Sequence, residues 1–125
     1  MDLEMNPMPI VCDMSTAPDT GPQRTAEYHR LFATHLLGRE RRGDGIRFRL
    51  RADHGVEAWV RDLAAREKAC CAFLDSQIVV ERSQVLWDIT TIDDDIARAI
   101  LDEYYDLPDS AGAAADGPER SPRAC

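Results

Sequence analysis

Residues 45–92 read GIRFRLRADHGVEAWVRDLAAREKACCAFLDSQIVVERSQVLWDITTI, and this stretch decides the expected fold. Near its start, IRFRLR alternates apolar side chains with arginine, which is the period-two pattern of a half-buried strand. Apolar residues then recur at steps of three and four, which predicts a helix capped by Asp53 and reaching about Leu74. Two β-rich runs flank a short turn and predict a hairpin, over Gln77–Arg82 and Val85–Ile92.

The flanking segments add one strand and two helices. Asp93 is expected to cap a helix that stops at Pro108, and an earlier helix is expected over Gln23–Arg39. Pro9–Asp13 is a short apolar run that suits a strand. The order is then βαβαββα, an α+β two-layer sandwich. From residue 45 onward it is a ferredoxin-like unit that lacks only its last strand. We expect Pro9–Asp13 to fill that edge, as in a circular permutation, with the helices on one face of the sheet.

Length and composition predict one domain with two disordered ends. A chain of 125 residues fits a single core, and we expect the domain to span residues 9–108. Residues 1–8 and the Ala-, Gly-, Pro- and Ser-rich residues 109–125 are expected to be disordered. There is no run of about 18 apolar residues and no basic, apolar signal at the N-terminus, so we expect a cytoplasmic protein. In that reducing location, cysteines bind metal, act in redox chemistry or pack in the core more often than they form disulfides.

The charge distribution limits the classes of partner. The net charge of −8 repels a nucleic-acid backbone, and aromatic residues for base stacking are scarce in the basic segment. Between Arg39 and Arg51 six arginines accompany two acidic residues, which leaves a net charge of +4. These charges have two possible roles. They either prevent an exposed edge strand from pairing with a strand of another chain, or they form a contact surface for an acidic partner at Arg47, Arg49 and Arg51. Nucleic acid and membrane are therefore disfavoured as partners, whereas an acidic partner and a homodimer stay open.

The central helix carries a cysteine–carboxylate cluster near its C-terminal end. Its apolar stripe reaches Leu63, and a further step of four reaches Glu67. Cys70 and Cys71 follow at i+3 and i+4, on the same side of the helix. A carboxylate on a buried face is unfavourable unless it is paired, hydrogen-bonded, protonated or bound to a metal, so Glu67 marks a candidate site. Adjacent cysteines in a regular helix diverge by about 100°, so a shared ligand requires the helix to loosen at Cys71.

Two functional interpretations of the cluster follow from its chemistry. The first is a site for a soft metal or metalloid of the Zn, Cu(I), Hg or As class, with Cys12, Cys70 and Cys71 as ligands. Glu67 would be the fourth ligand or a tuning group. The expected topology supports this interpretation, because Cys12 ends its strand at the edge of the sheet where the central helix also ends. The second is a cysteine-dependent enzyme in which Glu67 is the general acid or base for a nucleophilic Cys70 or Cys71. Two thiols beside a carboxylic acid would also suit cleavage of a carbon–metal bond.

Two further interpretations involve neither metal binding nor catalysis. The chain could be a non-catalytic interaction domain that uses its arginine strand, the strand that carries Arg47, Arg49 and Arg51. Alternatively, the cysteines could pack as small hydrophobic residues, with Glu67 paired to a buried arginine such as Arg30 or Arg47.

The run LAAREKACCAFL, residues 63–74, resembles a set of small bacterial proteins of unassigned function that carry a Glu-x-x-Cys-Cys-x-Phe motif. A cysteine in the first strand is also typical of that set, and Cys12 matches it. The resemblance covers roughly Pro9 to Pro108 and implies a site at Cys12, Glu67, Cys70 and Cys71. It also implies a link to heavy-metal response, which is suspected for some members. Members often have proline directly after the cysteine pair, where this chain has Ala72.

Overall fold

The structure is a computed structural model, and it describes residues 17–110 of the chain. Within these residues it is an α+β fold with three α-helices and a four-stranded antiparallel sheet, in the order αββαββα. A short 3-10 helix follows the last α-helix. The elements are α1 (Gly21–His35), β1 (Leu36–Arg42), β2 (Gly45–Arg51), α2 (Val56–Cys70), β3 (Leu74–Glu81), β4 (Gln84–Thr91), α3 (Asp95–Asp106) and η2 (Leu107–Ser110).

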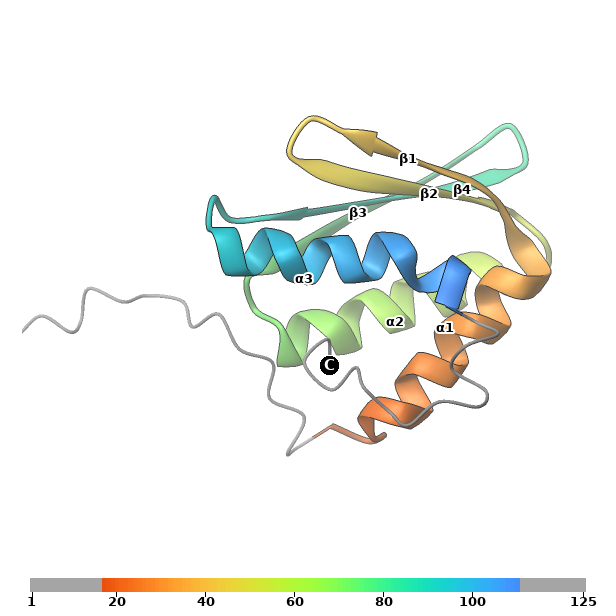
Figure 1. The fold of residues 1–125 in the computed structure, drawn as a ribbon. Coiled ribbons are helices and arrows are strands. Elements are labelled where there is room, and N and C mark those ends of the chain that lie inside the picture. The colour runs from red at the N-terminus through yellow and green to blue at the C-terminus, as the bar shows by residue number, and fades with distance from the viewer. Residues whose placement is uncertain (1–16, 111–125) are drawn as a thin grey trace, which may run out of the picture.

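The sheet has the strand order β1-β2-β4-β3, and every neighbouring pair is antiparallel. All three helices lie on one face of it (Figure 1). The register of β2 on β4 puts Phe48 opposite Trp87, and both side chains are buried against the helices. The next pair, Arg47 and Asp88, forms an ion pair on the open face. The alternation predicted for residues 45–51 is therefore confirmed, because the apolar side chains face the helices and the arginines face outward.

The expectation that Pro9–Asp13 fills the edge of the sheet next to β2 was wrong, because β1 occupies that edge; Pro9–Asp13 itself lies outside the described residues. The prediction of one helix over Gln23–Arg39 was also wrong at its C-terminal end. The helix stops at His35, and the chain turns directly into an extended strand. Gly38 favours this change for two reasons. Glycine is a poor helix former, and without a side chain at this position the side chain of Arg49 can pass over β1. A Cβ atom at Gly38 would lie 2.3 Å from the guanidinium group of Arg49 on β2.

Helix α2 is shorter than predicted at both ends. Its N-cap is Gly55, in the left-handed conformation with φ of 85°, and not Asp53. Oδ2 of Asp53 instead lies 3.0 Å from Nδ1 of His35, so the carboxylate contacts the end of α1 and does not cap α2. At the other end the helix stops at Cys70, and Leu74 already belongs to β3. Cys71 has left the helix, with φ of −123° and ψ of 77°, which is the loosening that a shared ligand requires.

Helix α3 starts one residue later than predicted. Its N-cap is Asp94 in place of Asp93, and the Asp94 carboxylate accepts hydrogen bonds from the backbone N–H groups of Ile96 and Ala97. The helix ends before Pro108, which lies in η2. No helix within residues 17–110 is both long and apolar enough to cross a membrane.

The core between the sheet and the helices is built around aromatic rings. Tyr28 of α1 stacks on Trp87 of β4, with ring centroids 6.0 Å apart, and meets Tyr104 of α3 edge-on at 5.8 Å. Phe32 and Phe48 continue the cluster, with centroids 4.7 Å apart. Tyr28 and Tyr104 thus enter the core from two different helices, and both side chains contact α2 through their hydroxyl groups.

Candidate metal centre

Glu67 points into the core, as its place on the apolar stripe of α2 predicts. It is 4% exposed, and both of its carboxylate oxygens accept hydrogen bonds. The hydroxyl of Tyr28 donates to Oε2 at 2.8 Å, and the hydroxyl of Tyr104 donates to Oε1 at 2.6 Å. Nη1 of Arg24 lies 3.4 Å from Oε2. The carboxylate is therefore held by side chains from α1 and α3, so all three helices meet at this residue.

Burial dominates the electrostatics of this carboxylate. Desolvation raises the pKa of Glu67 above its ordinary value of 4.5, although hydrogen bonds from Tyr104 and Tyr28 and the charge of Arg24 act in the opposite direction. Burial and the nearby Glu67 charge raise the pKa of Tyr28 and of Tyr104 well above the ordinary value of 10.0. Both hydroxyls therefore stay protonated at neutral pH and act as hydrogen-bond donors.

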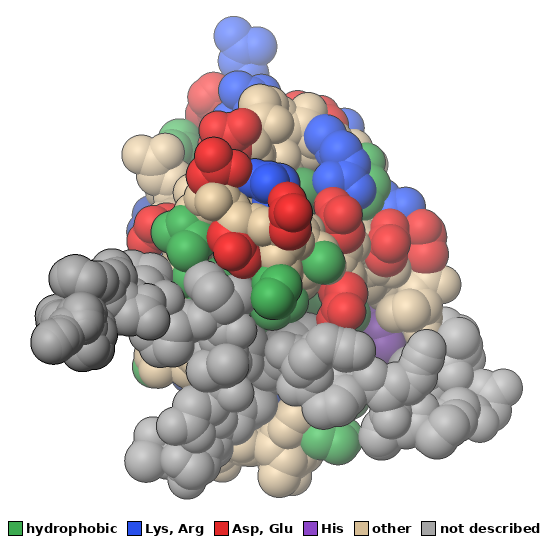
Figure 2. All heavy atoms as spheres, turned by 60° about the vertical axis from the view of Figure 1, so that its left-hand side comes forward, with side chains coloured by type: hydrophobic (Ala, Val, Ile, Leu, Met, Phe, Trp, Pro, Cys, Tyr) green, Lys and Arg blue, Asp and Glu red, His purple; other side chains and the backbone are tan. Residues whose placement is uncertain are grey.

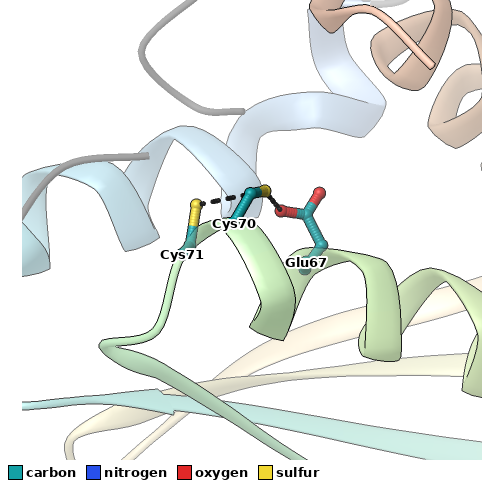
Figure 3. A group of neighbouring side chains, drawn as sticks. All are labelled: Glu67, Cys70 and Cys71. Carbon is teal, nitrogen blue, oxygen red and sulfur yellow. Dashed lines mark hydrogen bonds between the residues drawn. The ribbon is translucent and has the colours of Figure 1, made fainter. Parts of the chain in front are cut away.

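The sulfur atoms of Cys70 and Cys71 lie beside Glu67 at the end of α2 (Figure 3). The two Sγ atoms are 3.9 Å apart, and Sγ of Cys70 is 4.0 Å from Oε1 of Glu67. All three side chains are buried, and one ligand atom from each lies within 4.8 Å of the others. This buried group could hold a metal ion.

Arg24 is the charged residue that completes the cluster, and the sequence analysis missed it. Its side chain is fully buried, with Nη1 3.8 Å from Sγ of Cys70, while Nε and Nη2 bind both carboxylate oxygens of Asp19 at 2.6 and 2.7 Å. The two arginines suggested as partners for Glu67 lie elsewhere, since Arg30 is exposed and Arg47 pairs with Asp88.

A signal for Arg24 exists in the sequence. Arg24 precedes Tyr28 by four residues, and Leu31 and Phe32 continue the same face of α1. A cation at the start of an apolar stripe, like the acid in the stripe of α2, indicates a buried pair.

The thiol of Cys70 is poorly ionised in this environment. Burial raises its pKa above the ordinary value of 9.0, and the charge of Glu67 adds to that shift, whereas Arg24 opposes it. A bound cation would lower the pKa of the Cys70 thiol, because metal ligation needs the thiolate form and releases the proton.

The two neighbouring cysteines are in different chemical states. Cys71 is disulfide-bonded, whereas Cys70 is a free thiol. A free thiol is the expected state of a cysteine in a reducing location, so the disulfide of Cys71 differs from that expectation. Cys12, the third predicted ligand, lies outside the described residues, and its part in the site stays a prediction.

The arginine strand carries charges that are already paired within the chain. Arg47 pairs with Asp88 at 2.6 Å, Arg51 lies 3.3 Å from Asp53, and Arg49 lies 3.4 Å from Glu40. The positive potential that an acidic partner would need is thus reduced at Arg47, Arg49 and Arg51 by carboxylates of the same chain. A different face of the molecule, where α3 begins, presents several acidic side chains with basic ones among them (Figure 2).

Comparison with protein families, curated proteins and solved structures finds no match for this chain.

Proposed function

We propose that this chain binds a soft or borderline metal ion or metalloid, of the Zn, Cu(I), Hg or As class, with Cys70 and Cys71 as thiolate ligands. The observation that carries the proposal is the meeting of two sulfur atoms and a carboxylate within 4.8 Å in a buried site. Thiolate sulfur is the ligand that soft and borderline cations prefer. The site is also closed off from water, which strengthens the attraction between a cation and thiolates.

The spacing of the sulfur atoms favours an ion with three or four ligands. In a tetrahedral zinc site with Zn–S bonds of about 2.3 Å, two sulfur atoms lie about 3.8 Å apart, whereas a linear pair would lie about 4.6 Å apart. The distance between Sγ of Cys70 and Sγ of Cys71 is 3.9 Å. Such an ion needs one or two further ligands, and Cys12 is our candidate for one of them.

Glu67 is better suited to tuning the site than to binding the ion directly. Its two oxygens already accept bonds from Tyr28 and Tyr104, and the Arg24 guanidinium lies 3.4 Å from Oε2. Those contacts fix the position of the Glu67 carboxyl group beside the thiols, where its ionised form favours a bound cation.

A cysteine-dependent enzyme has less support. Reactive cysteines have a lowered pKa and are at least partly accessible to solvent. Cys70 is only 6% exposed and its pKa is raised, both of which disfavour a nucleophilic thiolate in the free protein.

Native mass spectrometry of the full-length chain tests the proposal. The protein is reduced with a phosphine, which does not compete as a thiol ligand, and is titrated separately with Zn²⁺, Cu(I), Hg²⁺ and arsenite. We expect one equivalent of at least one of these to be retained by the wild type and lost from Cys70→Ser. Cys125→Ser, which also removes one thiol, is the matched control and is expected to retain it.

Two further variants assign the remaining ligands. Loss of retention in Cys12→Ser would support the third sulfur, and partial loss in Glu67→Gln would support a tuning group. Loss in Glu67→Gln as complete as in Cys70→Ser would make Glu67 a ligand instead. Failure of the reduced wild type to retain any of the four probes, or equal retention by Cys70→Ser and Cys125→Ser, would overturn the proposal.

A further inference from the structure

We propose that the cluster is redox-gated, with the disulfide state of Cys71 deciding whether the site can be loaded. The inference rests on the proposed function and adds its regulation. It starts from the unequal states of the two neighbours, since Cys71 is disulfide-bonded and Cys70 is a free thiol. The disulfide therefore does not join the pair, although their sulfur atoms are 3.9 Å apart.

In the disulfide state the site lacks one of its two adjacent thiolates. Only the thiolate form of cysteine is a good metal ligand, and a disulfide sulfur carries no charge to offer a cation. Cys70 and Glu67 then remain, and Glu67 is held by Tyr28, Tyr104 and Arg24. A single thiol beside a carboxyl group that is already engaged is a weak site for a soft cation, so the oxidised form has lost most of its affinity.

Reduction supplies the missing ligand without a rearrangement of the backbone. The backbone N–H of Cys71 donates to the carbonyl oxygen of Glu67 at 2.6 Å, and the carbonyl oxygen of Cys71 accepts from the N–H of Leu74 at 3.0 Å. These bonds involve neither sulfur, and the Cys71 side chain is fully buried. They hold the residue at the junction of α2 and β3 in both states, so the released thiol stays next to Cys70.

The chemistry of the switch balances with a dithiol as the reductant. The dithiol gives two electrons and two protons to the disulfide of Cys71, becomes a disulfide itself, and leaves two thiols on the chain. A cation then binds Cys70 and Cys71 while their thiol protons go to solvent. By linkage, a bound cation should in turn protect Cys71 from oxidation, because the metal-bound thiolate is not available to form the disulfide.

Matched oxidised and reduced samples of the full-length protein test the gate. One sample is oxidised with diamide and freed of the reagent, and the other is reduced with a phosphine. Thiols are counted in denaturant, and a peptide map reports the state of Cys71. We expect two fewer thiols in the oxidised sample, Cys71 in a disulfide, and Zn²⁺ or arsenite retention at least about tenfold weaker than in the reduced sample. Prior loading with Zn²⁺ is expected to slow the oxidation of Cys71.

The outcomes separate this inference from the function it rests on. If the reduced sample retains no probe, the proposed function fails and the gate fails with it. If the reduced sample retains the ion and the oxidised sample, with its disulfide at Cys71 verified, retains it equally well, the gate alone is wrong. A peptide map that finds Cys71 as a thiol after diamide treatment would also overturn the gate. Cys71→Ser is the control, since its retention is expected to be weak and insensitive to diamide.

Discussion

Arginine–carboxylate pairs occur on both sides of the sheet, and they differ in their access to water. On the helix side, the side chains of Arg24 and Glu67 are 0% and 6% exposed. On the open side, the side chains of Arg47 and Asp88 are 20% and 27% exposed, and at the C-terminal end of β2 those of Arg51 and Asp53 are 49% and 48% exposed. An exposed pair contributes roughly 0–1 kcal/mol to stability, because water screens the charges. Breaking a buried pair costs about 3–5 kcal/mol, because it leaves an uncompensated charge in the core.

This difference indicates where chemistry is possible. The charged side chains of the open face are at least partly solvated, whereas those of Arg24 and Glu67 are buried. In the buried cluster one arginine, Arg24, contacts both Glu67 and the thiol of Cys70, so the charge states of these three groups depend on one another. A ligand that changes the charge of this cluster therefore acts on the whole packing of α1, α2 and α3.

The largest expected effect comes from removing the buried guanidinium. Arg24→Met removes the positive charge that faces the buried Glu67, whereas Asp19 keeps Arg66 at 3.0 Å, and we expect the free energy of unfolding to fall by about 3–5 kcal/mol. The matched substitution on the open face, Arg47→Met, removes a bidentate but partly solvated pair and is expected to lower it by only about 1 kcal/mol. Urea unfolding of both variants measures the difference, and equal losses would contradict the contrast between the two sides.

A smaller loss is expected when one donor to the buried carboxylate is removed. Tyr104→Phe deletes the 2.6 Å hydrogen bond to Oε1 of Glu67 and keeps the aromatic ring. Hydrogen bonds to charged groups contribute about 1.5–3 kcal/mol, so urea unfolding should report a loss in that range. Tyr105→Phe, next to it on the same helix, is the control. A loss no greater than that of the control would show that the carboxylate does not depend on Tyr104.

The smallest expected effect is a change in pH dependence. The pKa of Glu67 is raised in the folded state, so between about pH 4.5 and that folded pKa the native protein holds a proton that the unfolded chain has released. The contribution of Glu67 to stability is therefore largest below its unfolded pKa and falls as pH rises through the window. Glu67→Gln removes this dependence, because an amide does not titrate.

Unfolding free energies of the wild type and Glu67→Gln, measured from about pH 4 upward, check the sign. We expect the stability of the wild type, relative to the variant, to decline as pH rises. Glu57→Gln, on the exposed side of the same helix, corrects for the loss of a charge from α2. A relative stability of the wild type that increases with pH would mean that the hydrogen bonds outweigh burial and that the pKa of Glu67 is lowered.

Local patterns were sufficient to predict much of the fold and the centre of the site. Alternation predicted β2, and a step of four from Leu63 predicted that Glu67 faces inward. Both are properties of one element, so a short stretch of sequence contains the information. The same holds for the hairpin of β3 and β4, where two β-rich runs meet at a tight turn.

Features that depend on contacts between elements were not predictable. The segment LLGRERR of β1 has weak strand character, and it is extended because the edge of β2 is next to it. Helix α2 ends at Cys70 without the glycine or proline that usually marks an end. The convergence of Arg24, Tyr28 and Tyr104 on one carboxylate depends on how α1 and α3 pack, which the periodicity of each helix does not encode.

X-ray absorption spectroscopy of the reduced, zinc-loaded full-length protein is the decisive test of the metal centre, because it reports the atoms bound to the ion. We expect at least two sulfur neighbours at about 2.3 Å in the wild type and one fewer in Cys70→Ser. A first shell made only of nitrogen and oxygen, unchanged by Cys70→Ser, would contradict this expectation.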